Sequence, residues 1–280
     1  MELEKLKFED IGIIEFDGDK IRRDAYVDIN KTIEKPPLAL SIGQTSQGQN
    51  IYDCEFGTYG NFSCLHGASK SKKTFLKALI IATYIGGESI SYAPNIKSHR
   101  VGNKYILDFD TEQSKWHAQR VFKRAIKIVG EDYKYYAPFY LRRYDWNIRL
   151  EFIEWIMNQA PYKGNIGLVN IDGYADLVKD INDLDSCNNL VQKMMTLSDI
   201  HNCHITGILH SNYGTEKPTG HLGSAILKKA ETICRLEVDK IDKHITNVTF
   251  DYTRGFPIEP FQFTINDFGL PIIIEGNNIF

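Results

Sequence analysis

The chain has 280 residues, with 33 Lys and Arg against 36 Asp and Glu, a formal net charge of -3 and 42% hydrophobic residues. These values exclude a disordered or collagen-like chain, because the charge is balanced and the apolar fraction is ordinary for a protein with a buried core. The near-neutral balance also argues against a body coated with basic residues for nucleic acid. One main domain is expected, since α/β domains often reach this length.

Cysteine usage and the N-terminus indicate the compartment. The five cysteines include no CxxC pair, which argues against a disulfide framework and against a zinc ribbon and favours a reducing environment. The first residues, MELEKLKFEDIG, are charged and lack the apolar region of a signal peptide. No apolar run approaches the ~18 residues that a membrane helix needs. We therefore expect a cytoplasmic protein that has no membrane as a partner.

The predicted elements begin with an N-terminal extension, residues 1–41, which has an alternating stretch at 11–16 and a Pro36-Pro37 break. Residues 42–280 are expected to form one domain in which short apolar runs alternate with amphipathic segments, as in an α/β fold with a parallel sheet. The expected buried strands are 61–65, 105–109, 166–171 and 205–209. The expected helices are 73–85, 114–129, 184–200 and 221–230.

Each predicted helix has one apolar face. In the segment 114–129, for example, Trp116, Val121 and Phe122 fall at helical spacing and are expected to face the sheet. After residue 230 the pattern changes to strands separated by Gly and Pro turns. These strands, expected at 232–238, 246–252, 261–265 and 272–275, predict antiparallel hairpins that extend the parallel sheet.

The most informative segment is NFSCLHGASKSKKT, residues 61–74, in which an apolar strand runs into a glycine, a polar loop and a Lys-Thr pair at the head of a helix. Bound phosphates need backbone amides, a helix N-terminus, a lysine and a hydroxyl that holds magnesium. Gly67, Lys73 and Thr74 have the spacing for these roles. The expected nucleotide-binding residues are Gly67, Ala68, Ser69, Lys70, Ser71, Lys72, Lys73, Thr74 and Phe75.

One position departs from the pattern G-x-x-x-x-G-K-[ST], because Lys72 stands where the second glycine is usual. A side chain there hinders backbone conformations that glycine allows. Compensation could be electrostatic, since Lys70, Lys72 and Lys73 place three ammonium groups around one loop. The alternative is an ordinary basic turn between a strand and a helix.

Two carboxylates are candidates for the remaining chemistry. Asp172 follows the apolar run of IGLVNIDG and could hold magnesium through water, although aspartate is also common as a cap after a strand. Glu112 in YILDFDTEQS lies just past a strand end, where it could orient an attacking water. Alternation puts Asp108, Asp110 and Glu112 on one side, with Asp110 as a further partner of the metal. Glu112 could instead be an acidic residue in the first turn of a helix.

His210 ends the strand ITGILHSN. A polar side chain at this place could sense a γ-phosphate and signal its presence to the following loop. A histidine with a purely structural role is the alternative.

These strand-end features, in this order, resemble the RecA-like P-loop ATPases, and most closely the branch of RepA-type hexameric helicases and KaiC-like proteins. The likeness covers roughly residues 42–274 and rests on GNFSCLHGASKSKKTF, YILDFDTEQS, IGLVNIDG, ILHSN and GHLGSAILKKAETICRLE. The runs ASKSKKTF and DFDTEQS look like a group of RepA-like ATPases of mobile elements and phages in which a lysine-rich loop is usual. The resemblance implies a mainly parallel sheet between helices, followed by antiparallel strands.

The resemblance also implies roles for individual residues. Gly67, Lys73 and Thr74 would bind triphosphate and Mg²⁺, Glu112 would be the catalytic glutamate, Asp172 the Walker B carboxylate and His210 the γ-phosphate sensor. Family members assemble into rings in which ATP lies between subunits. Arg254, in FDYTRGFPIEP, matches the arginine that completes a neighbour's site in trans, although it could also be an exposed residue of a turn.

The loop SNYGTEKPTG, residues 211–220, corresponds to a family segment that faces nucleic acid at the ring centre. It holds Asn212, Tyr213 and Lys217, a weak set for binding a nucleic-acid backbone. The alternative, which the single basic residue favours, is a flexible polar loop without a nucleic-acid contact. The sequence therefore predicts an ATPase that uses ATP and Mg²⁺, forms a homo-oligomer, possibly a hexamer, and acts as a motor or helicase on single-stranded DNA. The alternative is an ATP-gated assembly or regulatory protein that unwinds nothing.

Overall fold

The computed structural model describes residues 16–211 and 217–274, and the chain divides into two compact units, Met1–Lys35 and Pro36–Phe280. In the first unit, α1 (Gly18–Ala25) begins at Asp17, whose carboxylate accepts a hydrogen bond from the amide of Lys20 and so caps the helix. Most of the stretch expected to alternate at 11–16 lies outside the described residues. The second unit starts six residues before the expected domain, because residues 38–41 already pair in a strand.

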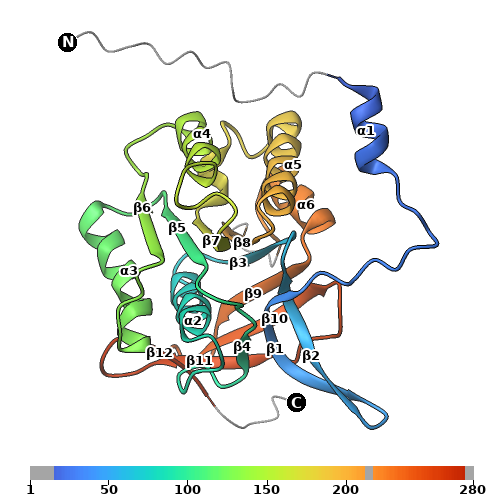
Figure 1. Cartoon of the computed structure of the whole chain (residues 1–280). Helices are drawn as coiled ribbons and strands as arrows, with labels where there is room; N and C mark the ends of the chain where they lie inside the picture. Colours follow the sequence, from blue (N-terminus) through green and yellow to red (C-terminus); the bar gives the residue numbers. More distant parts are fainter. Residues whose placement is uncertain (1–15, 212–216, 275–280) are drawn as a thin grey trace. The chain divides into compact units, whose positions relative to one another are not determined.

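The second unit is built on a nine-stranded sheet with the order β12-β11-β10-β9-β3-β8-β7-β5-β6 (Figure 1). Its parallel strands are β3 (Phe62–Gly67), β5 (Tyr105–Asp110), β6 (Tyr136–Tyr140), β7 (Ile166–Asp172), β8 (His204–His210) and β9 (Thr232–Val238). Its antiparallel strands are β10 (Thr246–Thr253), β11 (Phe261–Ile265) and β12 (Pro271–Ile273). The predicted α/β class, with a mainly parallel sheet followed by antiparallel strands, is confirmed.

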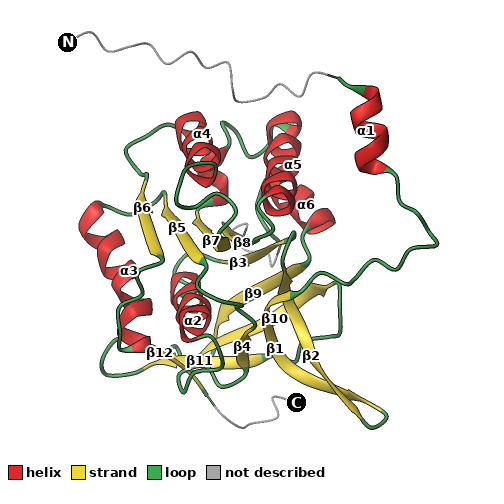
Figure 2. Ribbon diagram, in the orientation of Figure 1, coloured by secondary structure: helices red, strands yellow, loops and turns green. Residues whose placement is uncertain are grey.

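Helices cover both faces of the parallel strands (Figures 1 and 2). One face packs against α2 (Lys73–Gly86) and α3 (Lys115–Val129), and the other against α4 (Trp146–Met157), α5 (Leu184–Ile200) and α6 (Gly220–Lys229). A short 3-10 helix, η1 (Tyr174–Leu177), follows β7. The central strands β3, β5, β7 and β8 are buried along nearly their whole length, because a parallel sheet is covered on both sides, whereas the edge strand β6 is only partly buried.

One detail of the predicted helix faces is wrong. Trp116 is 61% exposed, whereas Ala118, Val121, Phe122 and Ala125 form the buried side of α3. Each residue advances an α-helix by about 100°, so Trp116, two positions before Ala118, lies on the opposite side of the helix. Its ring is instead covered by the guanidinium of Arg120, 4.9 Å from the ring centroid.

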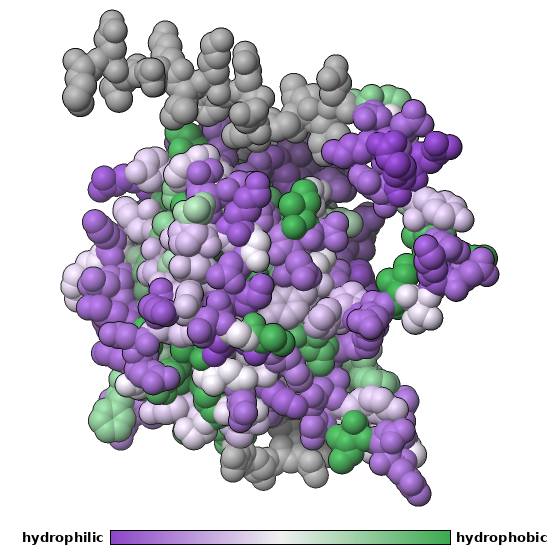
Figure 3. Space-filling model, in the orientation of Figure 1, coloured by the Kyte–Doolittle hydropathy of each residue, from purple (hydrophilic) through white to green (hydrophobic). Residues whose placement is uncertain are grey.

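A second sheet was not expected from the sequence. It has the order β2-β1-β4, with β1 (Leu38–Gln47), β2 (Asn50–Thr58) and β4 (Ile96–Ser98) all antiparallel, and β4 packs on α2. The face seen in Figure 3 is mainly hydrophilic, with hydrophobic residues scattered over it, as is usual for a protein surface. Among the described helices, none is long and apolar enough to cross a bilayer.

Candidate functional site

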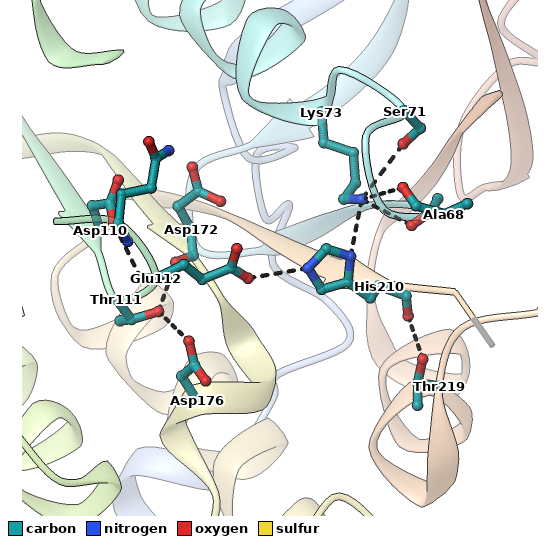
Figure 4. Close-up of polar contacts among 12 residues, drawn as sticks. Ala68, Ser71, Lys73, Asp110, Thr111, Glu112, Asp172, Asp176, His210 and Thr219 are labelled. Carbon is teal, nitrogen blue, oxygen red and sulfur yellow. Dashed lines mark hydrogen bonds and ion pairs between the residues drawn. The ribbon is translucent and has the colours of Figure 1, made fainter. Parts of the chain in front are cut away.

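The register of the sheet brings most of the predicted site residues to one edge. Parallel pairing sets Gly67 of β3 beside His210 of β8, and Asp110 of β5 beside Asp172 of β7. All four strands therefore end together, and the carboxyl edge of an open α/β sheet is where such folds bind ligands. The loop after β3 and the turn after β5 add Lys73 and the other expected residues to this edge (Figure 4).

The loop between β3 and α2 has the backbone of an anion-binding turn. Gly67 tolerates no side chain, because a Cβ there would lie 2.3 Å from the carbonyl oxygen of Leu236. Lys70 and Lys72 have φ of 66° and 64°, so left-handed residues flank Ser71, and such alternation points successive amides into one concavity. The amide of Ser71 donates to the carbonyl oxygen of Ala68, and that of Phe75 to the carbonyl oxygen of Lys72. The amides of Lys73 and Thr74, the first two of α2, have no acceptor within the helix. The loop thus offers several backbone donors to an anion.

Lys73 begins α2 and turns its ammonium back over the loop (Figure 4). Its Nζ donates to the carbonyl oxygens of Gly67 and Ala68 at 2.8 and 2.9 Å, and lies 3.4 Å from the hydroxyl of Ser71. Burial lowers the pKa of this ammonium, while the nearby charges of Glu112 and Asp172 raise it. A cation held by neutral acceptors can exchange them for a phosphate without breaking an ion pair.

His210 joins this lysine to Glu112. Its Nδ1 lies 3.3 Å from Nζ of Lys73, and its Nε2 lies 3.2 Å from Oε1 of Glu112. Because an ammonium only donates, Nδ1 is the acceptor, and Nε2 carries the proton and donates to the carboxylate. The hydrogen bond from His210 is the main cause that lowers the pKa of Glu112. The two residues expected to sense the phosphate and to polarise water are therefore in direct contact.

Asp110 closes the turn that carries Glu112. Its Oδ1 accepts the backbone amides of Glu112 and Gln113 at 3.1 and 2.8 Å, whereas its Oδ2 is buried without a hydrogen-bond partner. Burial raises the pKa of this carboxyl to about 6. Asp110 therefore orients the turn and also leaves one buried carboxylate oxygen without a hydrogen bond.

Asp172 does not stand alone at the end of β7. Its Oδ2 lies 3.0 Å from Nζ of Lys77, a buried residue of α2 that also lies 3.1 Å from Oδ1 of Asp108. Burial raises the pKa of Asp172, and Lys77 acts against that rise. The sequence reasoning missed Lys77, because a lysine one turn into a helix ordinarily faces solvent. Asp108, expected on the side of Glu112, is fully buried with this lysine.

Lys72 is bound to a different part of the chain. Its Nζ donates to the carbonyl oxygens of Lys243 and His244, at 3.1 and 2.8 Å, in the turn between β9 and β10. Phe75, the last of the expected nucleotide-binding residues, lies under the guanidinium of Arg124, 3.7 Å from the ring centroid. Four others, Gly67, Ala68, Ser69 and Ser71, line a cavity of about 250 Å³. The expected nucleotide-binding residues therefore do not all face the same cavity.

A buried histidine links the strands on the other side of the loop. Nδ1 of His66 lies 3.0 Å from the hydroxyl of Ser211, which follows His210, and Nε2 lies 2.9 Å from Oδ2 of Asp251 on β10. The amide of Ser211 also donates to the carbonyl oxygen of Gly67 at 3.0 Å. The end of β8 is thus attached both to the loop and to the antiparallel strands. Sequence spacing gave no signal for this contact, because its members lie far apart in the chain.

Arg254 lies at the opposite edge of the sheet. It follows β10, its amide donates to the carbonyl oxygen of Glu231, and its Nη1 lies 3.4 Å from Oδ1 of Asn61, the residue before β3. Six residues at ~3.3 Å each separate Asn61 from Gly67, a distance of roughly 20 Å. Arg254 is therefore outside the cluster formed by its own chain. Asn212 and Tyr213, expected to face nucleic acid, lie outside the described residues.

The fold and this edge define a class: an α/β protein with a large, mostly parallel sheet, whose carboxyl edge carries a glycine-containing loop, a lysine and a histidine–glutamate pair. Neither the comparison with protein-family models nor the search of curated proteins found a match for the chain. Within the described residues, no group of three or more His, Cys, Asp or Glu side chains is placed to hold a metal ion.

Proposed function

We propose that the chain is an Mg²⁺-dependent ATPase with a RecA-like fold. The observation that carries the proposal is the contact chain Lys73–His210–Glu112, which lies beside the loop at the carboxyl edge of the sheet. A triphosphate needs a cation and amides at its outer phosphates, and hydrolysis needs a group that orients water. Lys73, at the start of α2, supplies the cation, and Glu112, in the turn after β5, supplies the group that orients water. His210, at the end of β8, contacts both.

The residues present also fit magnesium. Mg²⁺ is commonly held by one or two protein oxygens together with nucleotide phosphates and water. The hydroxyl of Thr74, at the start of α2, and the carboxylate of Asp172 are the protein groups that would hold it. The bound metal would neutralise charge that develops on the phosphates.

In the proposed reaction, Lys73 releases the carbonyl oxygens of Gly67 and Ala68 and binds the outer phosphates together with the loop amides. Glu112 polarises a water for attack on the γ-phosphorus, and the bond to the leaving oxygen of ADP breaks. His210 loses Lys73 as its donor when the lysine moves to phosphate. Because Ser211 directly follows His210 in the chain, a movement of His210 on nucleotide binding is passed to the segment after β8.

For the biological role, we propose an oligomeric motor that acts on DNA in the replication or mobilisation of a mobile element, completed in trans by Arg254. This proposal is supported by the sequence resemblance and by the position of Arg254 away from its own site. The alternative, an ATP-gated assembly or regulatory protein, is favoured by the net charge of -3. We also propose a cytoplasmic location, which suits the five buried cysteines that remain thiols.

The test is ATP hydrolysis by the purified chain at low salt, with and without Mg²⁺ and single-stranded DNA. Lys73→Ala is expected to abolish turnover while the circular dichroism spectrum stays unchanged; turnover at the parent rate would refute the site. Stimulation by DNA supports the motor, whereas hydrolysis that DNA does not change favours the alternative. Mass measurement with a non-hydrolysable ATP analogue reports assembly in either case.

A further inference from the structure

Lys77 is the most deeply buried cation near the site. It lies one helical turn after Lys73 on α2, is 1% exposed, and has carboxylates of Asp108 and Asp172 at 3.1 and 3.0 Å from its Nζ. Burying an ammonium is costly unless it is paired. Burial alone would lower its pKa, but Asp108, Asp172 and Asp110 together raise it above its ordinary value. Lys77 is thus a permanent charge inside the fold.

Its two partners are held differently. Asp108 receives a second hydrogen bond, from the hydroxyl of Tyr136 at 2.7 Å, and is fully buried. Asp172 ends β7 at the carboxyl edge, and Lys77 contacts only its Oδ2. The contact with Oδ2 is an ion pair without hydrogen-bond geometry, and among the described residues no hydrogen bond reaches either carboxylate oxygen of Asp172. Asp108 therefore anchors the ammonium, and the ammonium in turn holds one oxygen of Asp172.

We propose that Lys77 is a positioning residue: it fixes the carboxylate of Asp172 through Oδ2 and leaves Oδ1 for a water of nucleotide-bound Mg²⁺. This inference rests on the proposed function. Lys77 cannot withdraw into solvent, because it lies between two acids and 5.8 Å from the ring centroid of Phe122. It reduces the formal charge of the cluster of Asp108, Asp110 and Asp172 without competing for Oδ1. Groups that orient a metal-binding side chain typically change metal affinity 10- to 100-fold.

The experiment measures the affinity of a fluorescent ADP analogue by anisotropy, with Mg²⁺ and with EDTA. In the parent, Mg²⁺ is expected to tighten binding. In Lys77→Met this tightening is expected to fall by about tenfold, while the affinity in EDTA stays within about twofold, because the loop and Lys73 are unchanged. Lys123→Met removes an exposed lysine from α3 and is expected to behave as the parent.

A double variant guards against a loss of folding. Lys77→Met alone leaves two buried carboxylates unpaired, which is strongly destabilising. Lys77→Met combined with Asp108→Asn removes one charge of each sign, and Asp172 then lacks the ammonium that positions it. This double variant is expected to show the same loss of the Mg²⁺ effect. Asp108→Asn alone keeps Lys77 on Asp172 and is expected to retain the effect.

The possible outcomes separate the two proposals. A folded double variant with the parent's Mg²⁺ effect, or a stronger one, would overturn the positioning role, and a stronger effect would identify Lys77 as a competitor of the metal. A parent chain that binds no nucleotide in either buffer would instead overturn the proposed function, and the inference about Lys77 with it.

Discussion

The imidazole Nε2 of His210 lies 3.2 Å from the carboxylate Oε1 of Glu112, although 98 residues separate them in the chain. The contact exists because β5 and β8 end at the same edge and β7 between them sets their spacing. Lys73 donates to the other ring nitrogen, so one proton arrangement satisfies all three side chains. In the state described here the general-base candidate is therefore held by the sensor candidate.

Glu112→Gln is the first prediction. Glutamine cannot polarise water as a carboxylate does, so ATP turnover is expected to fall by at least ~10²-fold, while nucleotide affinity changes little because Lys73 and the loop remain. Phosphate release and analogue binding measure the two effects. Glu131→Gln, at an exposed position, serves as the control, and parental turnover in Glu112→Gln would show that Glu112 is not the base.

Lys72 gives a prediction about the backbone. Its φ of 64° strains any residue with a Cβ by about 1–2 kcal/mol. Lys72→Gly and Lys72→Ala both lose the bonds to the carbonyls of Lys243 and His244, but the glycine variant is expected to be more stable than the alanine variant by about 1 kcal/mol. Urea unfolding measures the difference.

In the control for the Lys72 pair, the expected difference in stability between the glycine and alanine variants has the opposite sign. At Lys123, in the interior of α3, Ala favours the helix over Gly by about 1 kcal/mol, so Lys123→Ala is expected to be the more stable of that pair. Equal stabilities of the two Lys72 variants would mean that the loop relaxes when the lysine is replaced.

Asp110 predicts a pH dependence. Burial raises its folded pKa to about 6 from 3.8, so its contribution to stability is fully present below about pH 4 and is lost as pH rises through about 6. In Asp110→Asn the amide oxygen can still accept from Glu112 and Gln113. The stability of this variant relative to the parent is expected to improve by about 2 kcal/mol between pH 4 and pH 7.5.

Denaturant unfolding at both pH values tests the effect of Asp110. Asp132→Asn, at an exposed position, is expected to show no such difference from the parent. A constant offset between Asp110→Asn and the parent across this pH range would mean that Asp110 titrates normally.

If Arg254 completes the site of a neighbouring subunit, two inactive variants are expected to restore ATP turnover when they are mixed. Arg254→Ala and Lys73→Ala are each expected to be inactive alone, because every site lacks one group. An equal mixture of the two, exchanged into common oligomers, is expected to regain about a quarter of parental turnover, since some sites combine an intact Lys73 with a neighbour's Arg254. Arg142→Ala, at an exposed position, should retain parental turnover; a mixture that stays inactive would remove Arg254 from the site.

Local pattern was sufficient for much of this protein. The strand that ends at Gly67, the helix that begins at Lys73 and the strand that ends at Asp172 are predictable, because buried strands and amphipathic helices leave periodic apolar residues in the sequence. Strand ends in a parallel sheet also collect at one edge, so the grouping of Glu112 and His210 with the loop could be anticipated without coordinates.

Tertiary structure decided the rest, because it depends on register and on burial. Lys77 looks like an ordinary lysine in the sequence and Lys72 was expected at the phosphates, yet Lys77 is enclosed between two carboxylates and Lys72 reaches a distant turn. Contacts between segments far apart in the chain decide which lysine faces the loop, which acid that lysine neutralises and at which edge of the sheet Arg254 lies. No local pattern in the sequence encodes such contacts.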